Sequence, residues 1–166
     1  EDTRRLAAAM AAQLAGAGFD LNFAPVVDLD FPGSPAIGGL ERAFSSDPAM
    51  VAAHARAFIQ GMAEHRIISA LKHFPGHGSA TGDTHDGFVD VSRTWTMAEL
   101  EPYKTLFDEG FSGMVMVAHV TLAPGDLPAD LNPEIINGLL RHDLGWKGVV
   151  VTDDLQMKAI ASHYSL

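Results

Sequence analysis

The sequence has 166 residues, of which 47% are hydrophobic and 19% charged, a composition typical of a globular chain with one buried core. It contains no cysteine, which excludes disulfides, thiolate metal sites and cysteine nucleophiles and is compatible with a reducing cytoplasm. The 21 acidic and 11 basic residues give a net charge of -10, so we expect no nucleic-acid partner. No apolar run approaches the roughly 18 residues of a membrane span, so we expect no membrane insertion and no secretion signal.

Helix and strand signals alternate in the first half of the chain. Apolar side chains recur every four residues in an Ala-rich background, which predicts an amphipathic helix over about residues 2–16. A strand is predicted over 21–28, and the pair Asp47-Pro48 predicts the N-cap and first turn of a second helix. The run 67–73 is short, apolar and bounded by helix-breaking residues, which favours a buried strand.

The second half continues this alternation. Thr96 and Glu99 have the spacing of a capping box, which predicts that a helix begins near Leu100. The remaining predicted elements are a strand over 113–119, a helix from Asn132-Pro133 to about Asp143, a strand over 148–153 and a helical stretch from about Gln156. Such an order predicts an α/β fold with a parallel sheet and right-handed crossovers, and it fits an open doubly wound sheet and a closed barrel equally.

Ionisable residues stand at the end of each predicted strand. They are Asp28, Lys72-His73, His119 and Asp153-Asp154. Parallel α/β folds place the carboxyl ends of their strands on one rim, where loops build the active site, so we expect these side chains to converge. Successive strand residues point to opposite faces, so only one of Asp153 and Asp154 is expected to face a ligand directly.

The loop after the second strand is rich in glycine and small polar residues. Its composition over 76–87 suits a mobile loop that closes over a substrate. Asp83 and His85 lie two residues apart in it, a spacing at which the carboxylate can hydrogen-bond the imidazole and fix its tautomer.

A metal site in the same segment has weaker support. His73 and His77 have the spacing of two metal ligands on one helical face. Pro75-Gly76 lies between them and disfavours a helix, so zinc binding remains a minor alternative.

Several motifs together resemble glycoside hydrolase family 3, and within it the single-domain β-N-acetylglucosaminidases. The most specific are K-H-F-P-G-H-G over 72–78 followed by D-T-H over 83–85, and T-D-D-L-Q-M over 152–157. The segments 22–28, 41–48 and 118–120 match as well, so the resemblance covers essentially the whole chain. It implies a (β/α)8 TIM barrel.

The resemblance also implies a role for each matching residue. Asp153 matches the catalytic nucleophile, His85 the general acid/base and Asp83 the partner of His85. The residues expected to bind the substrate or to support its binding on the same rim are Arg42, Lys72, His73, His119 and Asp28. No cofactor and no metal are implied. Many relatives have Asp in place of Glu41 and Ser in place of Ala43, but neither position carries predicted chemistry.

These residue types fit a retaining glycosidase. Such an enzyme needs an ionised carboxylate that attacks the anomeric carbon, and a second group that first donates a proton and later takes one from water. A free imidazole titrates near pH 6.5, so a histidine can first donate and later accept the proton with only a small shift in its pKa. The expected substrate is a small carbohydrate with a terminal β-linked N-acetylglucosamine, in this subgroup a fragment from peptidoglycan recycling in the bacterial cytoplasm.

Other functions stay open at this point. Within the family they are a β-glucosidase, or an N-acetylglucosaminide phosphorylase in which the neutral imidazole admits phosphate. A metal-dependent hydrolase that uses His73, His77 and His85 is the rival reaction class. A sugar-binding protein without catalysis is the rival outside enzymes, and the presence of both Asp153 and His85 argues against it.

The length is short for the implied barrel. A (β/α)8 barrel typically has about 250 residues, whereas the sequence predicts only four strands. We therefore expect residues 1–166 to be the middle part of a barrel domain that lacks its first and last strands. We also expect this segment, expressed alone, to be poorly folded and inactive.

Overall fold

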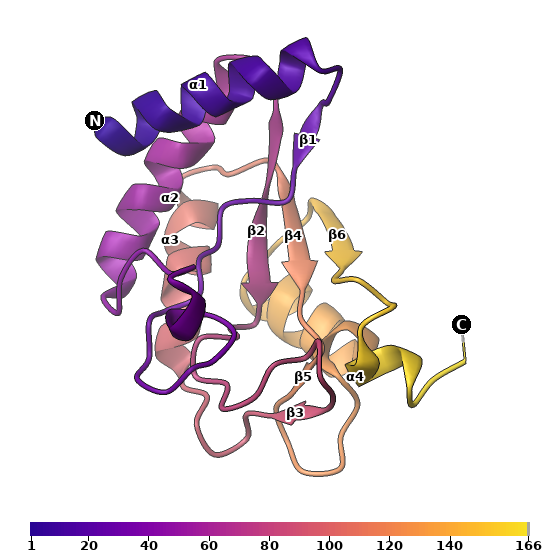
Figure 1. Ribbon diagram of the computed structural model, residues 1–166. Coiled ribbons are helices and arrows are strands. Elements are labelled where there is room, and N and C mark those ends of the chain that lie inside the picture. Colours follow the sequence, from indigo (N-terminus) through magenta and orange to yellow (C-terminus); the bar gives the residue numbers. More distant parts are fainter. Residues whose placement is uncertain (166) are drawn as a thin grey trace.

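A computed structural model describes residues 1–165. Its main sheet consists, in spatial order, of β1 (Leu21–Asn22), β2 (Ile68–Phe74), β4 (Met114–Val117) and β6 (Val149–Thr152). All neighbouring strands pair in parallel, which confirms the predicted parallel sheet. The arrowheads of β2, β4 and β6 point to the same end of the molecule (Figure 1), so their carboxyl ends share one rim.

Helices lie before, between and after these strands, as predicted. They are α1 (Asp2–Gly16), α2 (Pro48–Ala63), α3 (Glu101–Asp108), the π-helix η4 (Glu134–Asp143) and the short α4 (Lys158–Ala161). The N-cap prediction for α2 is confirmed, because Asp47 Oδ1 accepts a hydrogen bond from the Ala49 amide at 2.9 Å. Within residues 1–165, no helix is both long enough and apolar enough to cross a membrane.

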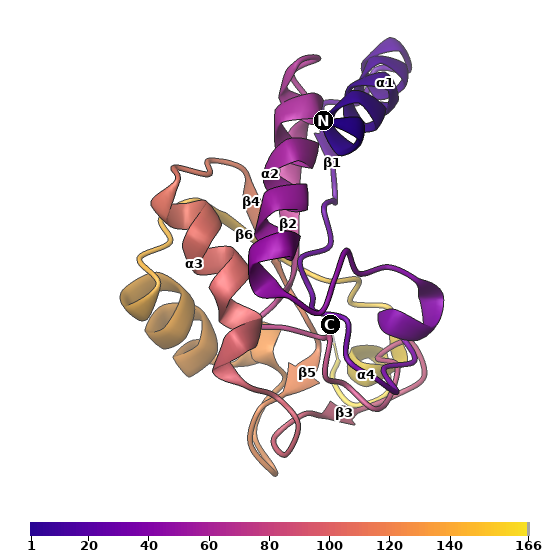
Figure 2. The ribbon, with the colours of Figure 1, turned by 90° about the vertical axis from the view of Figure 1, so that its left-hand side faces the viewer.

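The core lies between the sheet and the helices. α2 and α3 run side by side, and α1 packs on α2 (Figures 1 and 2). The buried aromatic and large aliphatic side chains that join the strands to α3 and η4 are Phe74, Tyr103, Leu106, Val115, Val117, Leu140 and Trp146. The burial of these side chains fixes the strand ends relative to one another, and hence the positions of the polar residues that follow them.

The first strand is shorter than predicted. Residues 21–28 were expected to form one strand, but β1 ends at Asn22 because Pro25 has no N–H to donate to the ladder. The segment nevertheless stays beside β2, where the Ala70 amide donates to the Ala24 carbonyl at 2.9 Å and the Val27 amide to the Lys72 carbonyl at 2.8 Å. Asp28 therefore still reaches the rim.

The predicted start of a helix near Leu100 is confirmed, because α3 (Glu101–Asp108) begins there, but the side-chain hydrogen bonds of a capping box are absent. Thr96 makes no side-chain cap hydrogen bond, and the chain forms a 3-10 turn, η2 (Met97–Leu100), before α3. Glu99 is 1% exposed and turns toward the loop after β2 instead of reaching back to Thr96. A second small sheet, in which β3 (Val89–Asp90) pairs in parallel with β5 (Val120–Thr121), was not predicted because two-residue strands leave no periodic pattern.

Candidate active site

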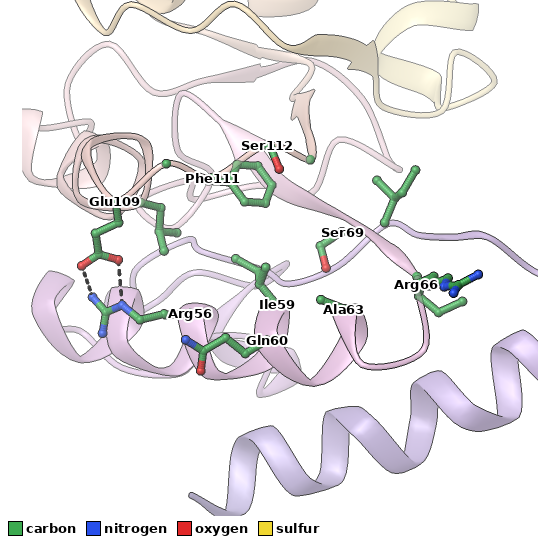
Figure 3. A pocket seen from close by; sticks show the side chains of 14 residues that line it. Arg56, Ile59, Gln60, Ala63, Arg66, Ser69, Glu109, Phe111 and Ser112 are labelled. Atoms are coloured by element: carbon green, nitrogen blue, oxygen red, sulfur yellow. Dashed lines mark hydrogen bonds and ion pairs between the residues drawn. The ribbon is translucent and has the colours of Figure 1, made fainter.

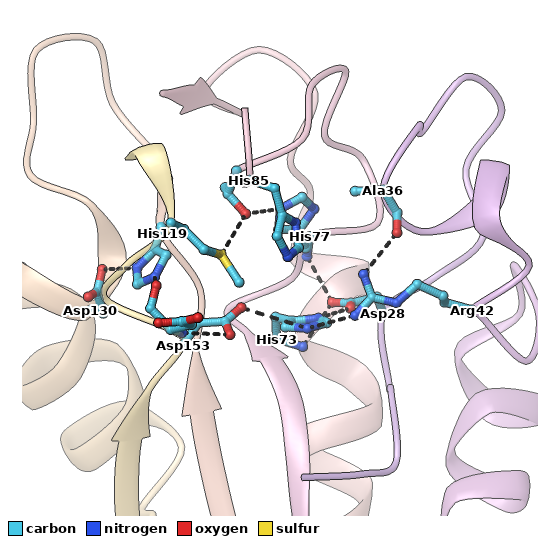
Figure 4. Close-up of polar contacts among 12 residues, drawn as sticks. Asp28, Ala36, Arg42, His73, His77, His85, His119, Asp130 and Asp153 are labelled. Atoms are coloured by element: carbon cyan, nitrogen blue, oxygen red, sulfur yellow. Dashed lines mark hydrogen bonds and ion pairs between the residues drawn. The ribbon is translucent and has the colours of Figure 1, made fainter. Parts of the chain in front are cut away.

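A hollow of about 230 Å³ lies at the carboxyl ends of the strands (Figure 4). Its lining comes from the segment after β1, the end of β2, the loop after β2 and the segment after β6. The lining residues are Ala36, Arg42, Lys72, His73, His77, Asp83, Thr84, His85, Asp153 and Met157. The predicted convergence of strand-end residues is thus present, except for Asp28 and His119, which are each 1% exposed and lie behind the lining.

Asp28 organises the floor of the hollow. Its Oδ1 accepts hydrogen bonds from the amides of His73 at 3.1 Å and His77 at 2.9 Å, and its Oδ2 accepts one from His73 Nδ1 at 2.6 Å. Burial by itself raises the pKa of Asp28, but the attraction and hydrogen bonds of His73 and His77 outweigh burial and lower that pKa from its ordinary value. The sequence predicted Asp28 among the substrate-binding residues, whereas the structure gives it a supporting position.

His73 has a defined tautomer in this arrangement. Because Nδ1 donates to the Asp28 carboxylate, the proton of the neutral ring sits on Nδ1 and leaves Nε2 as an acceptor. Arg42 Nη2 lies 3.3 Å from Nε2 and can donate to it. His73 Nε2 is also 3.9 Å from Asp153 Oδ2, so the ring stands between the two carboxylates.

Lys72 and Arg42 bring positive charge to the same hollow. Burial and the nearby Arg42 guanidinium lower the pKa of the Lys72 ammonium from its ordinary value, while Asp153 and Asp28 act in the opposite direction. Arg42 Nη1 donates to the Ala36 carbonyl at 3.0 Å, which fixes the guanidinium at the wall. A polar, neutral ligand rich in hydroxyl groups fits these fixed donors and acceptors.

Asp153, and not Asp154, faces the hollow. The Asp153 amide donates to the Val117 carbonyl at 2.9 Å, which extends the β4–β6 pairing up to the rim, and the side chain is 14% exposed. Asp154 Oδ1 instead accepts the Gln156 amide at 2.9 Å and stabilises the turn toward α4. This matches the expectation that only one of the two carboxylates would face a ligand.

The contact expected between Asp83 and His85 is present. Asp83 Oδ1 accepts from His85 Nδ1 at 2.7 Å and from the His85 amide at 3.0 Å. Burial raises the pKa of Asp83, but these two hydrogen bonds and the attraction of the ring outweigh burial and lower it. With Nδ1 committed to Asp83, His85 Nε2 is left to exchange a proton with a ligand in the hollow.

His77 supports the loop from within. Its Nε2 lies 3.4 Å from Thr84 Oγ1, and Thr84 Oγ1 also contacts the Met157 sulfur at 3.8 Å. Burial lowers the pKa of His77, which keeps the ring neutral. Across residues 1–165, no three His, Asp or Glu side chains are arranged to hold a metal ion, so the predicted zinc alternative finds no ligand set there.

His119 supports the segment Asp153-Asp154 from behind the hollow. Its Nε2 donates to the Asp154 carbonyl at 2.9 Å, and its Nδ1 is 3.1 Å from the buried Asp130 carboxylate. Burial lowers the pKa of His119, but Asp130 and the Asp154 carbonyl outweigh burial and raise it, as expected for a ring with two acceptors. The sequence predicted no role for Asp130, since an Asp in a single 3-10 turn (Ala129–Leu131) carries no signal for a partner in another segment.

We expect Asp28→Asn to lower the free energy of unfolding by about 2–4 kcal/mol, because an amide cannot accept all three hydrogen bonds. The folded-state pKa of Asp28 lies below its ordinary value of 3.8, so its stabilising effect is present above that pH and is lost as the pH falls through the folded-state pKa. The difference in the free energy of unfolding between the wild type and Asp28→Asn should therefore be largest above pH 4 and should disappear in acid. Urea unfolding at several pH values measures it, with the exposed Asp30→Asn as control. An equal loss of unfolding free energy in Asp28→Asn and Asp30→Asn would contradict the supporting role of Asp28.

A larger hollow of about 400 Å³ lies at the opposite end of the strands, between α2 and α3 (Figure 3). Ser69 at the start of β2 and Phe111 before β4 line it, and the ion pair of Arg56 with Glu109 stands at its edge. It contains no pair of groups suited to nucleophilic and acid/base chemistry. The smaller hollow at the rim is therefore the candidate active site.

Several known proteins are similar to this chain. The family model "Glycosyl hydrolase family 3 N terminal domain" matches residues 2–166. A β-hexosaminidase from Nitrosomonas eutropha is 37% identical to this chain over an alignment of 167 residues. The alignment covers 98% of this chain and 47% of the relative. The chain spans about half the length of the curated relatives that it matches.

Solved structures share the fold. Zn-bound CbsA from Thermotoga neapolitana has a TM-score of 0.89 at 35% identity, with 98% of this chain and 36% of that chain covered. A glycoside hydrolase family 3 β-N-acetylglucosaminidase from Paenibacillus sp. str. FPU-7 has a TM-score of 0.86 at 34% identity, with 98% of this chain and 32% of that chain covered. The parallel strands and their helices are thus part of a (β/α) barrel, which decides between the open sheet and the barrel.

Proposed function

Because the chain belongs to glycoside hydrolase family 3, we propose that it carries the catalytic centre of a retaining β-N-acetylhexosaminidase. The substrate would be a terminal β-linked N-acetylglucosamine, in fragments released during peptidoglycan recycling. The observation that carries this proposal is the position of Asp153 and the Asp83–His85 pair in the lining of one hollow. The β-hexosaminidase relatives and the β-N-acetylglucosaminidase structure support the substrate class. The cytoplasmic location stays a prediction.

The reaction would proceed in two steps. In the first, Asp153 attacks the anomeric carbon, the glycosidic bond breaks, and the proton on His85 Nε2 passes to the leaving oxygen. In the second, His85 Nε2 takes a proton from water, the resulting hydroxide displaces Asp153 from the anomeric carbon, and the β configuration is retained. Asp83 holds Nδ1 throughout, so that Nε2 carries the exchanged proton.

The sugar would be held by the fixed polar groups around the nucleophile. The Lys72 ammonium and the free N–H groups of Arg42 would donate hydrogen bonds to the sugar hydroxyls, and His73 Nε2, which accepts from Arg42, would orient the guanidinium. Lys72, Arg42 and His73 lie on one side of Asp153, whereas His85 lies on the loop after β2. The sugar ring can therefore bind to the first three residues before this loop brings His85 to the glycosidic oxygen.

A parallel assay with two aryl glycosides tests the proposal. We expect nitrophenyl N-acetyl-β-glucosaminide to be hydrolysed and nitrophenyl β-glucoside to react at least about 100-fold more slowly, since the site would lose contacts made only by the N-acetyl group. The first product should be the β-anomer. Preferential cleavage of the glucoside would indicate a β-glucosidase, a sugar 1-phosphate formed in phosphate buffer would indicate a phosphorylase, and loss of activity on chelation would indicate a metal-dependent hydrolase.

A further inference from the structure

Glu99 is a buried carboxylate that the proposed reaction does not use. It lies in η2, is 1% exposed and is absent from the lining of the hollow. Its Oε2 accepts a hydrogen bond from the Gly78 amide at 3.0 Å, and its Oε1 accepts one from Ser79 Oγ at 2.5 Å. Both donors belong to the loop that carries Asp83 and His85.

This loop has two parts with different environments. Residues 75–80, which we call the stem, are all buried. Residues 81–88, which we call the arm, are exposed or half-buried except for Thr84, and the His85 side chain is 59% exposed. Asp83 and His85 therefore stand on an exposed arm that joins a buried stem, so the position of the arm depends on how firmly the stem is held.

The stem is held between two carboxylates. On one side the His77 amide donates to Asp28 at 2.9 Å, and on the other side Gly78 and Ser79 donate to Glu99. Gly76 permits the approach, because its φ is +133° and a Cβ there would lie 2.5 Å from Glu99 Oε2. The absence of a side chain at Gly76 thus leaves room for the carboxylate of Glu99.

The stem in turn contacts the arm. His77, whose amide is fixed by Asp28, places its ring Nε2 3.4 Å from Thr84 Oγ1, between Asp83 and His85 in the chain. The Thr84 carbonyl accepts a hydrogen bond from the Ala159 amide at 3.3 Å, in the helix that follows Asp153. A shift of the stem would therefore move the acid/base relative to the nucleophile.

We propose, on the basis of the proposed function, that Glu99 is a positioning residue for His85. Its carboxylate fixes Gly78 and Ser79, so that the arm returns to the hollow in one geometry each time it closes. Glu99 acts through the stem and makes no contact with the substrate. Misplacement of a reacting group by about 1 Å can cost about 100-fold in rate, which sets the size of the effect.

The energetic setting of Glu99 separates this role from simple structural support. Burial raises the pKa of Glu99 to about 7, and Asp28 adds to the increase, while Ser79 and the Gly78 amide oppose it. Burial also raises the pKa of the Tyr103 phenol, and the charges of Asp28 and Glu99 add to that increase. Because the folded-state pKa lies above the ordinary value of 4.5, Glu99 lowers the free energy of unfolding as the pH rises from about 4.5 to about 7, and the loss is complete above that range. A neutral residue of the same shape would avoid this loss, so the carboxylate is retained at a cost in stability.

Glu99→Gln, made in a complete barrel that includes residues 1–166, tests the proposal. The amide keeps the shape but offers a single acceptor oxygen, so we expect kcat for an unactivated N-acetylglucosaminide to fall about 10-fold, with KM nearly unchanged. Glu99→Ala removes both acceptors and should lower kcat about 100-fold. A dinitrophenyl substrate, which needs no acid in the first step, should show a smaller loss in its pre-steady-state burst. At pH 8 the unfolding midpoint of Glu99→Gln should equal or exceed that of the wild type.

Glu101→Gln is the matched control, because Glu101 is exposed two residues further on and makes no side-chain hydrogen bond or ion pair within residues 1–165. Wild-type kcat in Glu99→Gln, or a lower unfolding midpoint with equal losses on both substrates, would overturn the positioning role. Amide hydrogen exchange gives a readout that is independent of activity. Exchange at Gly78 and in residues 81–88 should be at least about 10-fold faster in Glu99→Gln, and unchanged exchange would contradict the proposal even if the wild type cleaves no hexosaminide.

Discussion

Asp153→Asn is expected to abolish turnover, with a loss in kcat of at least about 10⁴-fold. An amide oxygen is a far weaker nucleophile than a carboxylate, so the covalent intermediate cannot form at a useful rate. The fold should be unaffected, because Asn Oδ1 can still accept the Asp154 amide, which donates to Asp153 Oδ1 at 2.8 Å. Steady-state hydrolysis of an aryl N-acetylglucosaminide and a thermal unfolding curve measure both effects.

Asp154→Asn is the matched control for this prediction. Its Oδ1 accepts only the Gln156 amide, a role that Asn can fill, so activity should stay close to that of the wild type. A wild-type rate in Asp153→Asn together with an inactive Asp154→Asn would show that Asp154 is the nucleophile. Loss of activity in both variants with a lowered unfolding midpoint would show that the segment after β6 has a structural role and would contradict the assignment.

His85→Ala is expected to lower kcat for an unactivated substrate by about 10²–10⁴-fold, because both the proton donor and the later base are removed. A dinitrophenyl glycoside has a leaving group that departs without a proton, so the burst of its first step should be largely retained. The glycosyl-enzyme should then accumulate. Azide, which attacks without a base, should restore turnover, and mass spectrometry of the trapped intermediate completes the measurement.

The chain offers a close control for His85. His142 forms a similar surface pair with Asp143, at 2.8 Å from Nδ1 to Oδ1, and lies away from the hollow. His142→Ala should therefore leave both substrates unaffected. Equal losses on activated and unactivated substrates in His85→Ala would remove the acid role and leave His85 as a sugar contact.

The order of elements could be predicted from local sequence. Helix periodicity over residues 2–16, the Asp47-Pro48 cap and the apolar runs before Lys72 and Asp153 depend on neighbours within a few positions, and each is present in the structure. The Asp83–His85 contact is equally local. The spacing of these two residues predicted their contact, whereas the roles proposed for Asp153 and His85 came from the family resemblance.

Partners that are distant in the sequence could not be predicted in this way. Glu99 has the spacing of a capping box with Thr96, yet its carboxylate binds Gly78 and Ser79, about twenty residues earlier. Asp28 was expected on the rim, but the sequence did not show that its carboxylate would accept hydrogen bonds from the amides of His73 and His77. In each case the partner came from another segment that folding brought close.

The sequence by itself determined that ionisable residues stand at the ends of the parallel strands, because residue type and periodicity are local properties. Only the tertiary structure decided which of them reach the hollow and which stand behind it. Asp153 and Asp154 are adjacent in the chain, yet one lines the hollow and the other holds a turn. The physical reason is that a buried ionisable group must find donors or acceptors wherever packing places them, and packing is set by the whole core.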